Sequence, residues 1–242
     1  VADALLLGKA LPWCTQLTML NVSNNRLAAE GCAALAEPLR ELPNLASLSL
    51  YNNHFGDEGA KAISTILVAN QSLTELNVGR NNICADGAKA ISEALINDAQ
   101  IRQRRRRQWK SLAVLKLGAN DIRTEGANHI ADMLKITRTL QKLSLDYNRI
   151  GDDGAKAVSV ALAANESIQE LILSQNGISA IGANAVIEAL AKNSTLEKLD
   201  LTYNGFDRSV ATQLDAAARF TVVHSWSQCT TVPTLGGLRG CS

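Results

Sequence analysis

The side chains that could perform catalysis or hold a metal ion are few and widely separated along the chain. The three histidines, His54, His129 and His224, lie far apart, without a matching nucleophile or a set of metal ligands beside them. No two of the five cysteines have the two-residue separation typical of a zinc site, and no glycine-rich phosphate-binding motif occurs. We therefore expect no enzymatic activity, no metal and no cofactor.

One basic cluster has a clear binding chemistry. Within six residues the chain carries Arg102, Arg104, Arg105, Arg106 and Arg107, and Trp109 follows shortly after. Guanidinium groups bind carboxylates and phosphates through paired hydrogen bonds. Because the formal net charge of the whole chain is only +1, an acidic protein surface or a polyacidic tail is favoured as the partner over nucleic acid. The alternative is a solvated loop without a function.

The elements that position these residues follow from a repeat that fills most of the chain. The segment LTMLNVSNNRL at 17–27 recurs at 45–55, 73–83, 112–122, 140–150, 168–178 and 196–206. Successive starts are 28 residues apart, except for one interval of 39 residues. An insertion of 11 residues therefore interrupts the period near 98–110, and the arginine cluster lies in it.

Each unit predicts a short strand followed by a helix. Apolar residues alternate in L-x-L, as a strand requires, and return at helical spacing in segments of the form G-A-K-A-I-S-x-A-L. The acidic pairs Asp57-Glu58 and Asp152-Asp153 precede such segments and are expected to cap the helices that begin there. Stacking of the units predicts an α/β fold, a right-handed βα solenoid with a parallel sheet on its concave face and helices on its convex face.

Two residue types recur at fixed positions of the unit. The ninth position holds an asparagine in all seven units: Asn25, Asn53, Asn81, Asn120, Asn148, Asn176 and Asn204. We expect these amides to bond to neighbouring loops, and Gly31, Gly59, Gly87, Gly126, Gly154 and Gly182 to recur for backbone reasons. The four Asn-x-Ser/Thr sequons at Asn21, Asn70, Asn165 and Asn193 are interpreted as by-products of this repetition, not as glycosylation sites.

The unit L-x-x-L-x-L-x-x-N-x-Φ with its strict 28-residue period resembles the leucine-rich repeats of the ribonuclease-inhibitor-like subclass. Similar repeats occur in NOD-like receptors, the Ran GTPase-activating protein, tropomodulin, and flagellar or protist proteins. The resemblance covers about residues 2–220 and implies a horseshoe-shaped arc. It says little about function, because the scaffold defines the family.

Three parts are expected along the chain. Residues 1–16 match the helix half of an upstream or N-terminal capping repeat, residues 17–220 comprise seven repeats with the basic insertion, and residues 221–242 form a non-repeat tail or cap. The first residue is Val1, which suggests processing or a fragment. Because no secretory signal and no membrane-spanning apolar run occur, we expect a cytoplasmic protein, with a cytoskeletal or axonemal location included.

Positions 3, 5, 7 and 8 of each unit should form the concave face. The residues expected to bind a partner there are Tyr51, Arg80, Lys142, Asp146, Tyr147, Glu170, Lys198, Asp200 and Tyr203. All three tyrosines of the chain occupy position 7 or 8, and tyrosine is a favoured anchor at protein interfaces. The alternative for each tyrosine is that the repeat merely tolerates it.

These patterns favour a non-catalytic protein–protein interaction scaffold or adaptor, a structural or regulatory subunit of a larger assembly such as a cytoskeletal or axonemal one. Two alternatives are implied by the resemblance. An activator of a small GTPase would resemble the Ran GTPase-activating protein, although that family's acidic C-terminal region has no counterpart in residues 221–242. The ligand-sensing repeats of a NOD-like receptor would need a nucleotide-binding domain, which this sequence does not contain.

Overall fold

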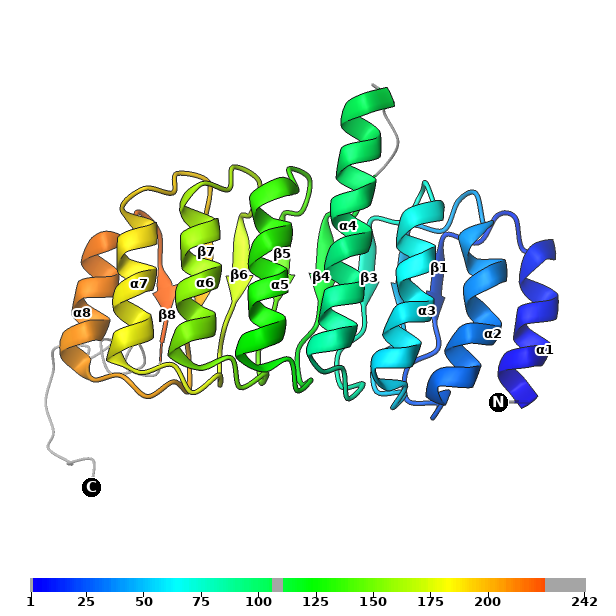
Figure 1. Cartoon of the computed structure of the whole chain (residues 1–242), viewed down its shortest axis with the longest axis horizontal. Helices are drawn as coiled ribbons and strands as arrows, with labels where there is room; N and C mark the ends of the chain where they lie inside the picture. The colour runs from blue at the N-terminus through cyan, green and yellow to red at the C-terminus, as the bar shows by residue number, and fades with distance from the viewer. Residues whose placement is uncertain (1, 106–110, 225–242) are drawn as a thin grey trace, which may run out of the picture.

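The computed structural model describes residues 2–105 and 111–224, apart from the side chains of Arg102, Arg104 and Arg105. In this part of the chain, eight short parallel strands pair in chain order to form one sheet (Figure 1). The strands are β1 (Met19–Asn21), β2 (Ser47–Ser49), β3 (Glu75–Asn77), β4 (Val114–Lys116), β5 (Lys142–Ser144), β6 (Glu170–Ile172), β7 (Lys198–Asp200) and β8 (Val222–Val223).

The helices lie side by side in a row that covers one face of the sheet (Figure 1). They are α1 (Ala2–Ala10), α2 (Ala28–Arg40), α3 (Gly56–Ala69), α4 (Ala85–Arg105), α5 (Arg123–Ile136), α6 (Gly151–Ala163), α7 (Ala180–Leu190) and α8 (Arg208–Ala217), with a 3₁₀ turn at Leu11–Trp13. From β1 to α8, strand and helix alternate, so the predicted α/β solenoid arc with a parallel sheet is confirmed.

The repeat period sets the register of the sheet. The middle leucine of each strand from β2 to β7 lies beside the same leucine of the next strand, and each is at most 1% exposed. These leucines are Leu48, Leu76, Leu115, Leu143, Leu171 and Leu199. The residues on either side of them are half-buried in most strands, which places alternate side chains on the concave face.

The position-nine asparagines link neighbouring units, as the sequence predicts. In Asn148, Nδ2 donates to the carbonyl oxygens of Leu145 and Asp146 in its own unit and of Leu117 in the preceding unit, each at 3.0 Å. Its Oδ1 accepts the Ile122 amide at 3.4 Å. Since a carboxamide both donates and accepts, one side chain satisfies backbone groups of two units at once.

Three of the sequons form a second set of links, which the sequence interpretation missed. Asn70, Asn165 and Asn193 are buried at the loops between helix and strand. Asn165 Nδ2 donates to the carbonyl oxygens of Leu134 at 2.7 Å and Thr137 at 3.2 Å, both in the preceding unit. Because this nitrogen is buried and bonded, the Asn-x-Ser/Thr pattern is structural at these three positions.

The glycines at the helix starts recur for a different physical reason from the one expected. Gly59 and Gly154 do not need a left-handed backbone. Instead, a Cβ added to Gly59 would lie 2.4 Å from Phe55 Cβ, and one added to Gly154 would lie 2.8 Å from Ile150 Cβ. These glycines recur because a side chain has no room there.

The first residue of each acidic pair, Asp57 or Asp152, caps the following helix, while its side chain makes no cap hydrogen bond in its own helix. Asp57 Oδ1 accepts the amides of Cys84 at 2.7 Å and Gly87 at 2.9 Å, at the start of α4. Asp152 Oδ1 accepts the amides of Ser179 at 2.7 Å and Gly182 at 3.0 Å, at the start of α7. Each carboxylate therefore joins two units as well as satisfying helix N-terminal amides.

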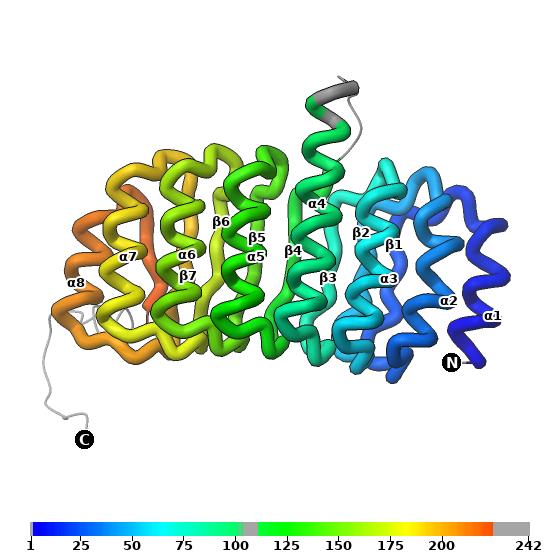
Figure 2. Tube along the Cα trace, in the orientation of Figure 1, coloured from blue at the N-terminus to red at the C-terminus, as the bar shows by residue number. Residues whose placement is uncertain are grey.

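The insertion lengthens α4. A helix ending near Asn97 is expected from the repeat, but α4 continues to Arg105 and has 21 residues, against 14 in each of α3 and α5. Figure 2 shows α4 extending past the level at which its neighbours end. The residues D-A-Q-I-R-Q-R-R at 98–105 include no glycine or proline and are mostly good helix formers, so the helix does not stop.

The C-terminal end of the sheet is covered by residues beyond the last repeat. Val222 is 1% exposed, and β8 pairs with β7. The nearly buried His224 places Nε2 3.2 Å from both carboxylate oxygens of Asp215 on α8. Trp226, an aromatic residue of the same predicted tail or cap, lies outside the described residues.

Candidate protein-binding hollow on the concave face

Position 8 of every unit has a left-handed backbone. Its φ values range from 54° to 63° in Asn24, Asn52, Arg80, Ala119, Tyr147, Gln175 and Tyr203. Residues other than glycine rarely adopt this conformation, and here each turns the chain out of its strand. At this turn Tyr147 is 51% exposed and Tyr203 is 71% exposed.

Two adjacent glycines at position 7 open a hollow between larger neighbours. Gly79 and Gly118 follow β3 and β4, with Tyr51 in the unit before them and Asp146 in the unit after them. A Cβ on Gly79 would lie 3.1 Å from Tyr51 Cδ2, and one on Gly118 would lie 2.6 Å from Asp146 Oδ2. Both flanking side chains therefore lean over the glycines, and the hollow between them has a volume of about 370 Å³.

The hollow offers charges of both signs. Among the described residues, Arg80 has no ion-pair partner, and Asp146 accepts a hydrogen bond from Ser144 through Oδ1 alone. Lys116 also lines the hollow, but its Nζ lies 2.6 Å from Glu75 Oε1. The guanidinium of Arg80 and Oδ2 of Asp146 are thus the charged groups with bonding capacity left for a partner.

Three other predicted residues form ion pairs with one another. Glu170 accepts from Lys142 at 2.8 Å and from Lys198 at 2.9 Å, across strands β5, β6 and β7. Burial acts to raise the pKa of Glu170, but the two lysines outweigh it and hold that pKa below its usual value. The same contact with Glu170 raises the pKa of Lys198. This row of ion pairs is less available to a partner than the hollow.

The structure therefore divides the nine predicted concave-face residues into three groups. Tyr51, Arg80, Asp146 and Tyr147 line the hollow, the ion-paired row forms the second group, and Asp200 and Tyr203 lie towards the C-terminal end. Asp200 Oδ1 accepts the amide of Thr202 at 2.9 Å and its hydroxyl at 2.8 Å.

The two glycines and Lys116 line the hollow but are not among the residues that the sequence analysis predicts to bind a partner. Aligning the seven units would have revealed them, because Gly79 and Gly118 are the only glycines at position 7. The two glycines matter because they lie in neighbouring units. Two neighbouring units that both lack a side chain at position 7 leave a gap, whereas one such unit would not.

The second predicted site lies mostly outside the described residues. Arg106, Arg107 and Trp109 are not described, and of Arg104 and Arg105 only the backbone, in the last turn of α4, is. In the described ranges, no three or more His, Cys, Asp or Glu side chains are placed to hold a metal ion. No helix in these ranges has the length and apolar character needed to cross a membrane.

Comparison with known proteins identifies the repeats. Six segments match the leucine-rich repeat family, and together they make up more than half of the chain: residues 14–36, 41–64, 69–92, 138–159, 164–186 and 192–207. The unmatched stretch from 93 to 137 contains the insertion and the unit that follows it. No curated protein sequence matches the chain.

Solved structures with a similar fold include "Leiomodin-1 Actin-Binding Site 2 (ABS2)", at 25% identity and a TM-score of 0.53, over 67% of this chain and 87% of that one. A Bacteroides fragilis protein aligns over 91% of this chain and 68% of its own, at 14% identity and a TM-score of 0.52, which shows the fold alone. The Caenorhabditis elegans tropomodulin C-terminal domain aligns over 79% of this chain and 93% of its own, at 17% identity and a TM-score of 0.49.

Proposed function

Because the chain belongs to the leucine-rich repeat family, whose solenoids are in general protein-interaction modules, we propose that it is a non-catalytic scaffold in a cytoskeletal assembly. Its partner docks on the concave face at the hollow between Tyr51 and Asp146. The protein acts in the cytoplasm, where such assemblies form.

The observation that carries this proposal is the hollow itself. The exposed ring of Tyr147 lines the same hollow as Arg80, whose guanidinium has no ion-pair partner among the described residues, and as Asp146, which has a carboxylate oxygen available. Tyrosine and arginine dominate binding energy at protein interfaces when they surround a pocket that the partner fills. The shape and the charges of the hollow suit a protruding polar segment of another protein.

Actin is the first partner to test. The leiomodin-1 structure named for an actin-binding site shares the solenoid and a quarter of its aligned residues with this chain. That likeness supports actin more directly than the other partners implied by the resemblance to leucine-rich repeat proteins. A role in activating a small GTPase is supported by that resemblance alone.

The test compares actin binding by the native chain and by the double variant Arg80→Asn, Tyr147→Asn. Asparagine tolerates the left-handed backbone at both positions, so the fold should be kept while the guanidinium and the ring are removed. Sedimentation with actin filaments and thermophoresis with actin monomers measure the affinity. We expect a loss of about tenfold or more in the double variant.

The matched control removes two charges from the opposite face. Lys89→Ala with Lys156→Ala changes exposed lysines on α4 and α6 and should leave the affinity unchanged. If the concave and convex variants bind equally well, the placement of the site is wrong. If the native chain binds neither form of actin, actin is not the partner.

A further inference from the structure

A second hollow lies on the opposite side of the molecule, where the insertion breaks the regular contact between α4 and α5. In regular units a buried Asn, such as Asn70, is followed two residues later by a serine whose hydroxyl bonds to it, here Ser72 at 3.0 Å. The matching residues at the insertion are Asp98 and Ser111, which are thirteen positions apart but still in contact, Ser111 Oγ to Asp98 Oδ2 at 3.5 Å.

In the unit that follows the insertion, the residue at the position of the linking asparagine makes no described hydrogen bond to α4. Thr137 occupies the position of Asn70 and Asn165, and its hydroxyl donates to Met133 O of its own helix at 3.1 Å. Asn70 Nδ2, by contrast, reaches back to Leu39 O and Leu42 O of the preceding unit, each at 3.0 Å. Exchange of asparagine for threonine thus turns a bond between units into a bond within one helix.

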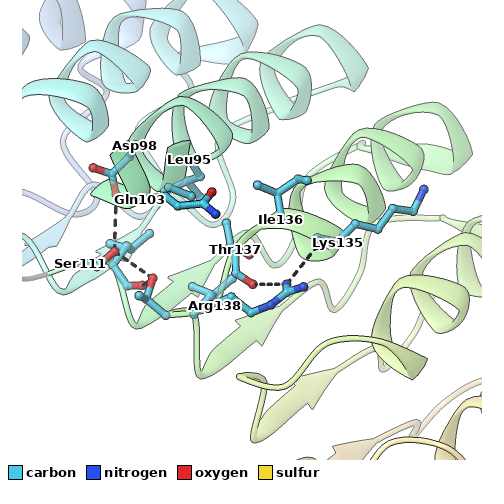
Figure 3. A pocket seen from close by; sticks show the side chains of 12 residues that line it. Leu95, Asp98, Gln103, Ser111, Lys135, Ile136, Thr137 and Arg138 are labelled. Atoms are coloured by element: carbon cyan, nitrogen blue, oxygen red, sulfur yellow. Dashed lines mark hydrogen bonds between the residues drawn. The ribbon is translucent and has the colours of Figure 1, made fainter. Parts of the chain in front are cut away.

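The result is a groove of about 510 Å³ between the extended part of α4 and the C-terminal end of α5 (Figure 3). Leu95, Ala99 and Gln103 of α4 form one side, and Ile136 with the residues that follow it forms the other. Ile136 is 45% exposed, an unusual position for a large aliphatic side chain. The volume is that of a typical ligand or peptide side-chain pocket.

Two basic side chains line the rim of the groove. Lys135 and Arg138 are exposed at its rim, and Arg138 Nη1 donates to the carbonyl oxygens of Lys135 and Thr137, each at 3.0 Å. Of the acidic groups nearby, Asp98 is buried and Asp132 pairs with Lys135 at 2.8 Å.

We propose that this groove binds a short acidic segment of a partner protein, which inserts one large apolar side chain between α4 and α5. The apolar walls favour a hydrophobic side chain, and Lys135 and Arg138 at the rim favour carboxylates next to it. The apolar content of the groove also favours a peptide over RNA. This surface is separate from the concave hollow, so the inference does not depend on the concave site or on actin.

The probe for the test is a fluorescein-labelled twelve-residue peptide with one central Trp between runs of Glu. Anisotropy titrations with the full chain should give an affinity in the micromolar range at low salt, weakened by added salt because exposed charges are screened. A peptide with Trp→Ser and one with Glu→Gln should each bind at least tenfold more weakly.

Two variants of the chain test the groove directly. Ile136→Ser removes its exposed apolar wall, Ala99→Phe fills it, and each should weaken binding of the probe at least tenfold. Val68→Ser is the matched control, because Val68 is also 45% exposed but lies between α3 and α4. The concave variant Arg80→Asn, Tyr147→Asn should bind the probe as the native chain does.

Several results would overturn this proposal. Equal binding by the native chain and Ile136→Ser would do so, as would tighter binding of an oligouridine RNA than of the acidic probe. Binding that appears only after Trp109→Ser would make this chain's own segment the occupant of the groove. A dimer that Ile136→Ser dissociates in sedimentation would make a second copy the occupant.

Discussion

At the level of single residues, the solenoid depends on side chains that satisfy backbone groups of two units at once. Asn148 is fully buried and donates to three carbonyl oxygens, one of them in the preceding unit. Asn25, at the same position of the first unit, is exposed and donates to Val22 O and Ser23 O of its own unit. An asparagine at position nine therefore links two units where it is buried, as at Asn148, but the described side-chain bonds of Asn25 stay within its own unit.

We expect Asn148→Ala to lower the free energy of unfolding by about 1–3 kcal/mol, because buried carbonyl groups lose their donor. Asn25→Ala should cost less than about 1 kcal/mol, since water replaces the lost amide there. Urea denaturation of both variants, followed by circular dichroism, measures the difference. Equal losses at the two positions would contradict the structural role assigned to the links between units.

The thiol of Cys32 gives a second prediction at this scale. Cys32 is 2% exposed on α2, and burial raises its pKa to about 12. At pH 8 its thiolate is therefore scarce as well as inaccessible. Alkylation by iodoacetamide, located by peptide mass spectrometry, should modify the exposed Cys14 and leave Cys32 intact until the chain is unfolded. Equal rates at Cys14 and Cys32 would contradict this.

At the level of the elements, the sequence predicts a good deal and misses what depends on neighbouring units. The 28-residue period locates every strand from β1 to β7 and the helices between them. It does not reveal that Asp57 and Asp152 cap the next helix, because a contact between units is invisible along the chain. The period also predicts that α4 ends near Asn97, whereas the helix continues to Arg105. The repeat pattern stops at the insertion, but the residues of the insertion still favour a helix.

The concave hollow shows the same limit. Four of its residues are predicted as partner-binding from their position in the unit alone, Tyr51, Arg80, Asp146 and Tyr147. Lys142, Glu170 and Lys198 are predicted on the same grounds, yet their side chains pair with one another. Position in a repeat determines which face a residue occupies, but its availability depends on the residues of the adjacent strands.

The capping aspartates make a prediction about pH. Burial acts to raise the pKa of Asp152, but hydrogen bonds from the Ser179 hydroxyl and from the amides of Ser179 and Gly182 outweigh it and lower that pKa. The ordinary pKa of an aspartate is 3.8. Asp152 therefore contributes its full stabilisation at pH values above 3.8, and this contribution is lost as the pH falls through the lower pKa of the folded state. Asp152→Asn should cost about 1 kcal/mol at pH 7, and the cost should shrink below about pH 4.

The neighbouring residue is the control for this experiment. Asp153 is exposed, so Asp153→Asn should leave both the stability at pH 7 and its pH dependence close to those of the native chain. Thermal unfolding across a series of pH values measures both variants. A cost for Asp152→Asn that stays constant down to about pH 2 would show that the charge of this carboxylate is not what caps α7.

At the scale of the whole molecule, each unit contacts its neighbours, so the stability of the arc depends on the contacts between successive units. The contact between α4 and α5 differs from the others because the insertion separates Asp98 from Ser111 and Thr137 replaces the linking asparagine. The groove lined by Ile136 is a consequence of that difference. A binding surface thus arises where the repeat is least regular.

Restoring the regular repeat should therefore close this surface without damaging the arc. Replacing residues 98–111 by the Asn-Gln-Ser of residues 70–72, together with Thr137→Asn, recreates the link seen at Asn165. The new hydrogen bonds should raise the melting temperature by about 2–4 °C and abolish binding of the acidic peptide probe. A lower melting temperature would show that the insertion supports the fold.

The measurement that tests the central claim most directly is amide hydrogen exchange of the chain with and without saturating actin. Docking at the concave hollow predicts slower exchange in peptides covering 51–54, 79–82, 118–121 and 146–149, the loops that follow β2, β3, β4 and β5. The helices on the opposite face should exchange as in the isolated chain. Protection of the helices α3 to α6, with none in these four loops, would contradict the account.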